Sequence, residues 1–231
     1  RVDLNKNRYE LAENEITIIE LLVKSTGFVE MQDEDIVIEL DVKAPDNKVE
    51  SLLSIVPGMY KSSYEQIISE GSGRLEAKVS GIYNANKSYY PALDMVFELN
   101  DALIQYPDMP LPLKELNALV EINASEKDWS DMQLLLNNLQ MIIDKRQIGA
   151  TARITELTGD MHVDAKLTGS LAMNSLSKAL PSAKALKDGL LKTDLKLDAK
   201  KSDIINRKFE NIVFQGKMEL DNFKMNYKNE D

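Results

Sequence analysis

The chain has 231 residues, of which 43% are hydrophobic and 29% charged, and its net charge at pH 7 is −10. It has no cysteine, which excludes disulfides, thiolate metal sites and cysteine nucleophiles. Its single histidine, His162, excludes a metal site built on two histidines. The sequence has no basic block, and nucleic-acid phosphates are bound by clustered Lys and Arg, so we expect no nucleic-acid partner.

Targeting and membrane signals are weak in this sequence. No basic stretch followed by an apolar run is visible after Arg1, so no signal peptide is expected within it. The longest apolar stretches, 16–23 and 134–143, are interrupted by polar residues such as Glu20 and Asn137. Neither stretch approaches the ~20 residues that a membrane-spanning helix needs. A membrane anchor would therefore have to lie outside this sequence.

Hydrophobic residues recur with a period of two over most of the chain. In 36–42, 75–79 and 95–99, apolar residues alternate with residues that are mostly charged. This pattern predicts strands with one apolar and one polar face, which is typical of antiparallel sheet with one side in water. The alternation also occurs in 29–31, 116–122, 161–167, 195–199, 214–220 and 223–227, and we expect ten or more such strands in all.

Two or three short helices are expected between the strands. Val49, Leu52, Leu53 and Val56 form one stripe of a first helix, with Asp46 as its N-cap. The spacing of apolar residues predicts the other two helices at 60–68, ending at Gly71–Gly73, and at 176–186.

Proline marks one further connection. Three prolines in 106–112 exclude regular sheet there and predict two strands joined by this segment, between Leu99 and Val120. No low-complexity linker divides the sequence, so we expect a single elongated domain over 1–231, mainly β with a few short helices (α+β).

Catalytic and metal-binding motifs are weak. Ser175 and Lys178 match S-x-x-K, but neither S-D-N nor K-T-G follows them. The acidic run 33–35 lacks the spacing of a calcium loop, and a hairpin tip explains it equally well. His162 fits the polar face of a strand, and Trp129 fits edge packing. We therefore expect no enzyme activity, no cofactor and no metal site.

The apolar strand faces are the most informative feature of the sequence. Ten strands with one apolar face each present more area than two or three short helices can cover. The sheet must then curl on itself, pack against a second sheet, or keep a face open for an apolar ligand. The pattern alone leaves these alternatives open.

Four passages carry a resemblance to a known family. The most distinctive is the strand, Tyr-Pro, Pro, strand sequence from Leu99 to Val120. The others are a strand-then-helix step ending in Pro at 36–57, a strand ending in Gly at 73–81, and a Gly-strand-helix-Pro step at 167–181. Taken in their order along the chain, the four passages resemble the C-terminal region of the AsmA family of bacterial envelope proteins, over about residues 30–225.

The resemblance implies an elongated, twisted antiparallel sheet that curls into an open apolar groove. The AsmA-like group, with its bridge-like lipid-transfer relatives, is associated with phospholipid movement across the envelope and with outer-membrane integrity. Its members usually have an N-terminal membrane anchor and a long periplasmic part, and the family has no catalytic motif. The resemblance therefore implies that this chain is a fragment of a longer periplasmic protein, anchored to the inner membrane through a segment outside this sequence.

We accordingly expect a non-enzymatic envelope segment with an apolar β-groove for phospholipid binding or transport between membranes, in support of outer-membrane assembly. Its partners would be phospholipid acyl chains and, through the absent anchor, the envelope membranes. The alternative is a structural or protein-interaction β-sandwich with a closed core. The expected groove residues alternate with charged neighbours in three segments, and they are Leu75, Ala77, Val79, Met95, Phe97, Leu99, Ala118, Val120 and Ile122.

Overall fold

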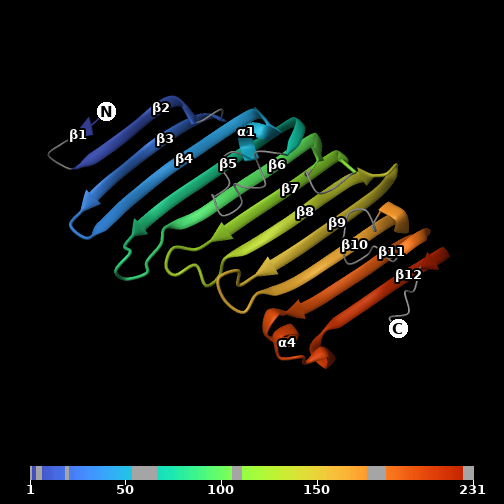
Figure 1. Cartoon of the computed structure of the whole chain (residues 1–231). Coiled ribbons are helices and arrows are strands. Elements are labelled where there is room, and N and C mark those ends of the chain that lie inside the picture. The colour runs from blue at the N-terminus through green and yellow to red at the C-terminus, as the bar shows by residue number, and fades with distance from the viewer. Residues whose placement is uncertain are drawn as a thin grey trace, which may run out of the picture.

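The computed structural model describes residues 2–3, 7–18, 21–53, 67–105, 111–175 and 186–225. These residues form one antiparallel sheet of twelve strands, in which each strand pairs with its neighbours in sequence (Figure 1). The sheet is open, with β1 and β12 at its two edges. The expectation of a mainly β chain with an elongated, twisted, open sheet is confirmed. The strands are β1 (Val2–Asp3), β2 (Arg8–Ile18), β3 (Leu21–Gln32), β4 (Asp35–Lys48), β5 (Ile68–Tyr83), β6 (Ala92–Gln105), β7 (Leu113–Ala124), β8 (Gln133–Ile143), β9 (Arg146–Thr155), β10 (His162–Ala172), β11 (Leu186–Lys200) and β12 (Val213–Met225).

The helices are short and lie at the two long margins of the sheet. Helix α1 (Val49–Leu53) directly follows β4, and α4 (Lys201–Ile205) and the 3-10 helix η3 (Phe209–Asn211) connect β11 to β12. In Figure 1, α1 lies in front of the sheet near β5, and α4 lies at the opposite margin. None of the helices in the described part of the chain is long and apolar enough to cross a membrane.

The strand register separates apolar from polar side chains. Leu75 of β5 lies opposite Phe97 of β6, which lies opposite Val120 of β7, so the three share one face of the sheet. Their charged neighbours Glu76 and Glu98 lie on the other face. We call the first the apolar face and the second the polar face. Cross-strand partners keep to the same side on either side of each register shift, so the same division runs from β2 to β12.

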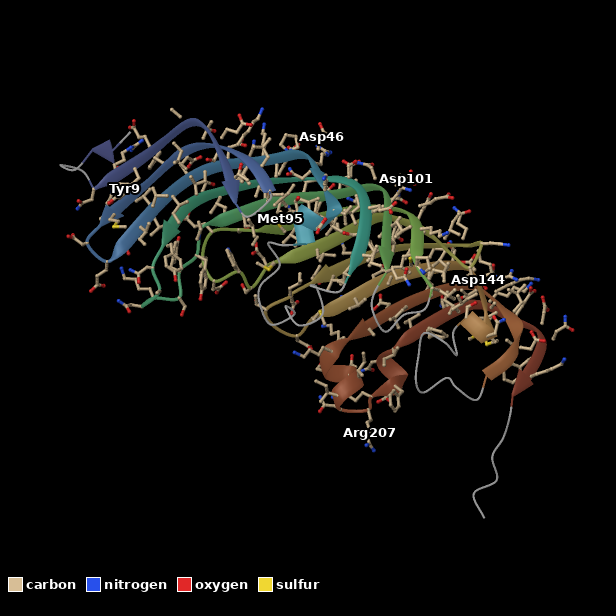
Figure 2. The ribbon with its side chains drawn as sticks, turned by 45° about the horizontal axis from the view of Figure 1, so that its top comes forward. Tyr9, Asp46, Met95, Asp101, Asp144 and Arg207 are labelled. Atoms are coloured by element: carbon tan, nitrogen blue, oxygen red, sulfur yellow. The ribbon has the colours of Figure 1, made fainter. Side chains whose placement is uncertain are left out.

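A row of bulges bends the strands at the margin where α1 lies. The pairing shifts register between Ala44 and Asn47 in β4, and again between Leu99 and Ala102 in β6. At these bulges Asp46 and Asp101 have φ of 50° and 46°, and both lie along one long margin of the sheet (Figure 2). Each bulge inserts an extra residue and bends its strand. We call this edge the bent margin.

Among the described residues, the buried hydrophobic cluster lies at the bent margin. Val49 and Leu52 of α1 are 1% and 3% exposed, and burial of such side chains contributes about 1.5–3 kcal/mol each. They pack against buried residues from the bent strand ends, namely Leu21, Val23, Ala44, Leu99, Ala102, Ile104, Leu116 and Ala118.

The polar face carries cross-strand ion pairs. Nε of Arg74 lies 2.5 Å from Glu98 across the β5–β6 pair, and Nζ of Lys192 lies 2.8 Å from Asp221 across β11–β12. Lys217 pairs with Glu219 along β12 and holds the pKa of that carboxyl below its ordinary value. Such exposed pairs contribute little individually because water screens them, but they favour the observed strand register.

Several expected boundaries are wrong. Asp46 does not cap α1, because it occupies a bulge in β4 and the helix begins only at Val49. Gly71–Gly73 lie inside β5, which begins at Ile68, so they do not end a helix. Leu186 begins β11, although the sequence places it in the third helix. The rest of the second and third helices, 60–66 and 176–185, lies outside the described residues.

The prediction around the three prolines is confirmed in its strands. β6 ends at Gln105 and β7 begins at Leu113, so the two strands flank the proline segment as expected. Residues 106–110 of that segment lie outside the described residues.

Candidate functional site: the apolar face

The nine expected groove residues all lie on the apolar face. Ala77 pairs with Met95, which pairs with Ile122, and Leu99 pairs with Ala118. Leu99 and Ala118 are buried, at 7% and 9% exposure, because they lie at the bent margin under α1. The other seven are half-buried. The structure thus brings the set together on one surface, whereas its contact with lipid stays a prediction.

The apolar face extends beyond the expected set toward β12. Leu167 of β10 is 42% exposed, and Phe214, Met218 and Leu220 of β12 are 46–60% exposed. At the other end, Tyr9 of β2 is 44% exposed. The sequence already indicates that Leu167 and the β12 residues belong to the apolar face, since 161–167 and 214–220 show the same alternation as the central strands. The face is therefore most open at its ends.

One glycine allows α1 to approach the sheet closely. Gly73 lies opposite Leu99, and a Cβ on it would be 2.5 Å from the carbonyl oxygen of Glu98 and 2.8 Å from Cδ1 of Leu52. A side chain at this position would push α1 away from the strands. Gly73 thus explains why the helix covers the bent margin, while the middle of the face lacks such a cover in the described residues.

Ser175 is placed as a structural residue. It is 2% exposed, and its Oγ donates a hydrogen bond of 2.6 Å to Oδ2 of Asp144 in the β8–β9 hairpin. Nε2 of His162 lies 2.7 Å from Asp198 on the polar face of the β10–β11 pair, and not in the β8–β9 hairpin that Ser175 contacts. Lys178 lies outside the described residues. The described hydrogen-bond partners of Ser175 are thus Asp144 and the adjacent Asn174, and His162 is not among them.

We predict that the chain does not hydrolyse esters and that Ser175→Ala changes nothing in such an assay. The substitution should lower the free energy of unfolding by about 1.5–3 kcal/mol, because it removes a hydrogen bond to a carboxylate. Release of p-nitrophenol from p-nitrophenyl butyrate measures the first effect, and urea denaturation the second. Hydrolysis by the native chain that disappears in Ser175→Ala would contradict the non-enzymatic interpretation.

The acidic run 33–35 forms a hairpin tip. Asp35 accepts a hydrogen bond from the buried Asn84 side chain and lies 3.5 Å from Nζ of Lys87. The Asn84 amide, with Lys87, holds the pKa of Asp35 below its ordinary value. The carboxylate thus ties the β3–β4 hairpin to the β5–β6 loop. Among the described residues, no group of three acidic or histidine side chains is placed to hold a metal ion.

Trp129 packs at the margin opposite α1. Its Nε1 donates a 2.7 Å hydrogen bond to the carbonyl oxygen of Pro91, and its ring lies 5.0 Å from that of Tyr90. It joins the β5–β6 and β7–β8 connections, as expected for edge packing.

One large hollow lies away from the apolar face. It has a volume of about 750 Å³ and opens on the polar side of the C-terminal half of the sheet. Its lining includes side chains engaged in cross-strand ion pairs, such as Lys192 and Asp194. A hydrocarbon chain lying there would have to displace water from these charged groups, which is unfavourable. The exposed apolar area, and not this hollow, is the better candidate site. The lining includes Gln140, Gln147, Thr168, Ser170, Lys192 and Asp194.

Comparison with known proteins found no match for this chain among protein-family models, curated proteins or solved structures.

Proposed function

We propose that this chain is a non-enzymatic segment of a bacterial envelope protein that binds phospholipid acyl chains along its apolar face and supports their transport between membranes. The observation that carries the proposal is a single open sheet whose apolar face runs across the strands without a second sheet on it in the described part of the chain. A face of this kind requires a cover, and an acyl chain provides one without any specific polar contact.

The free energy of burying hydrocarbon favours a contact that runs along the whole acyl chain and needs no specific polar partner. A hydrocarbon chain in water costs ~0.8 kcal/mol for each exposed CH₂ group. Alternate side chains from neighbouring strands, such as Leu75, Phe97 and Val120, form continuous apolar rows across the sheet. A chain lying along such a row is shielded over its length, while its head group stays in water at a margin of the sheet.

The cellular setting of the proposal derives from the resemblance to the AsmA family. It comprises a periplasmic location, an inner-membrane anchor outside this sequence and a role in outer-membrane integrity. The competing function is a structural or protein-interaction β-sandwich, in which a second sheet or a partner covers the apolar face. The two differ in whether lipid contacts the central apolar side chains.

Site-specific photo-cross-linking tests the proposal. A benzoylphenylalanine placed at Phe97, which is half-buried on the apolar face, should form an adduct with phospholipid when the chain is illuminated in cells. The matched control is the same group at the adjacent Val96, which is half-buried on the polar face. Mass spectrometry of the intact protein should detect a lipid mass only for the first variant.

Two other cross-linking results would count against lipid binding on the apolar face. Adducts of Phe97 with protein and none with lipid would favour the interaction domain. Equal lipid labelling at both positions would indicate unspecific contact with membranes and would contradict a site on the apolar face.

A further inference from the structure

The outer edge of β12 is unpaired in the described part of the chain. β12 pairs with β11 on one side, and no described strand lies on its other side (Figure 1). Its apolar-face side chains are the most exposed of the sheet, with Phe214 at 60% and Met218 at 57%. An edge strand presents unpaired N–H and C=O groups, which favour addition of another strand.

We propose that β12 pairs antiparallel with β12 of a second copy of this chain, about a two-fold axis through Met218. The two-fold axis of such a pair is perpendicular to the sheet, so both apolar faces lie on the same side. The two sheets then form one continuous apolar face twice as wide. This inference rests on the edge of β12 and does not require that lipid binds.

Charge complementarity selects the register. With Met218 opposite Met218 of the second copy, Lys217 faces Glu219 of the second copy, and the symmetry makes this ion pair twice. A shift by one position that keeps the apolar faces aligned centres the axis on Glu219 or on Lys217. Each shift places two like charges directly opposite one another, which is unfavourable. Centring on Met218 avoids both repulsions.

Side-chain size supports the same register. Gly216 would lie opposite Leu220 of the second copy, and because the glycine has no side chain it cannot clash with that leucine. Leu220 is 46% exposed, and this pairing would cover it. The bulge at Asn222, with φ of 51°, limits the shared ladder to the segment between Phe214 and Asn222. The segment is self-complementary in charge and in volume.

Sedimentation equilibrium at low ionic strength tests the proposal. The 26.0 kDa chain should show a concentration-dependent mass rising toward twice that value. Lys217→Glu places acidic side chains opposite one another, and Glu219→Lys places lysines opposite one another. Each variant alone should therefore dimerise at least about tenfold more weakly than the native chain.

A mixture of the two variants provides the decisive measurement. In a mixed dimer, each acidic side chain of the first variant faces a lysine of the second, so the equimolar mixture should regain the dimer. A folding defect cannot be rescued in this way, which separates the interface from stability. Lys24→Glu is the matched control, since Lys24 is exposed on β3, far from β12, and carries the same change of charge.

Three results would overturn the inference. They are a native chain that stays monomeric at about 100 µM, a dimer that Lys217→Glu does not weaken, and two weakened variants that do not associate when mixed. The last outcome would indicate that the substitutions act on β12 itself.

Discussion

Val120→Arg should leave the chain folded and remove most of its bound phospholipid. Val120 is half-buried in the middle of the apolar face, between Phe97 of β6 and Leu136 of β8. On an open face, the long arginine side chain can direct its guanidinium to water, so the sheet tolerates it. A bound acyl chain loses contact with about two or three CH₂ groups, which costs about 2 kcal/mol, or roughly 30-fold in affinity.

The matched control is Leu119→Arg. Leu119 is the adjacent residue of β7, is equally half-buried, and lies on the polar face opposite Asn138. The Leu119→Arg variant introduces the same charge at an equally half-buried position of the same strand, so this variant should retain lipid. Organic extraction of the purified variants, followed by phosphorus determination, gives the lipid content, and thermal unfolding followed by circular dichroism gives the stability.

A closed core predicts another pattern. There, arginine at position 120 would be an unpaired charge in an apolar interior, which costs several kcal/mol and would unfold the domain. A native chain that yields no phospholipid, together with a Val120→Arg variant that fails to fold, would favour the sandwich. Both measurements are therefore needed on both variants.

The sequence predicts the two faces because a strand has a strict period of two. Once Leu75, Phe97 and Val120 are assigned to strands, each marks the apolar face of its own strand. Burial then favours a register that brings these faces to the same side of the sheet. The same rule would have assigned Phe214 and Met218 to the apolar face. They are not among the expected groove residues because that set was confined to the central strands.

Bulges explain what the alternation could not predict. In β8, the apolar positions Leu134 and Leu136 are followed by Leu139 and Met141, and the shift in parity at Asn137 conceals the strand. β9 was missed for another reason, since its apolar-face positions include the small residues Ala150 and Ala152, which give a weak signal.

The extent of the buried core also depends on tertiary structure. The apolar stripe of α1 is visible in the sequence, but its position over the bent margin is set by the bulges at Asp46 and Asp101 and by the close approach at Gly73. Positive φ at an aspartate has no reliable sequence signal. The sequence therefore predicts an apolar face and leaves open which part of it is covered.

Leu52→Ala should strongly destabilise the chain. Leu52 is 3% exposed and joins α1 to the buried cluster at the bent margin. Removal of three carbons from a packed site costs about 2–5 kcal/mol, through lost transfer energy and the remaining cavity. The midpoint of urea denaturation should fall accordingly.

Leu167→Ala is the matched control for this prediction, because it removes the same atoms from the same face. Leu167 of β10 is 42% exposed, so its truncation leaves no closed cavity and should cost less than about 1 kcal/mol. The difference between the two variants measures how unevenly the apolar face is covered. If Leu167→Ala were as destabilising as Leu52→Ala in the lipid-free chain, a protein surface would have to cover β10 as well. The open face on which the proposed function depends would then be contradicted, because a covered β10 leaves no surface there for an acyl chain.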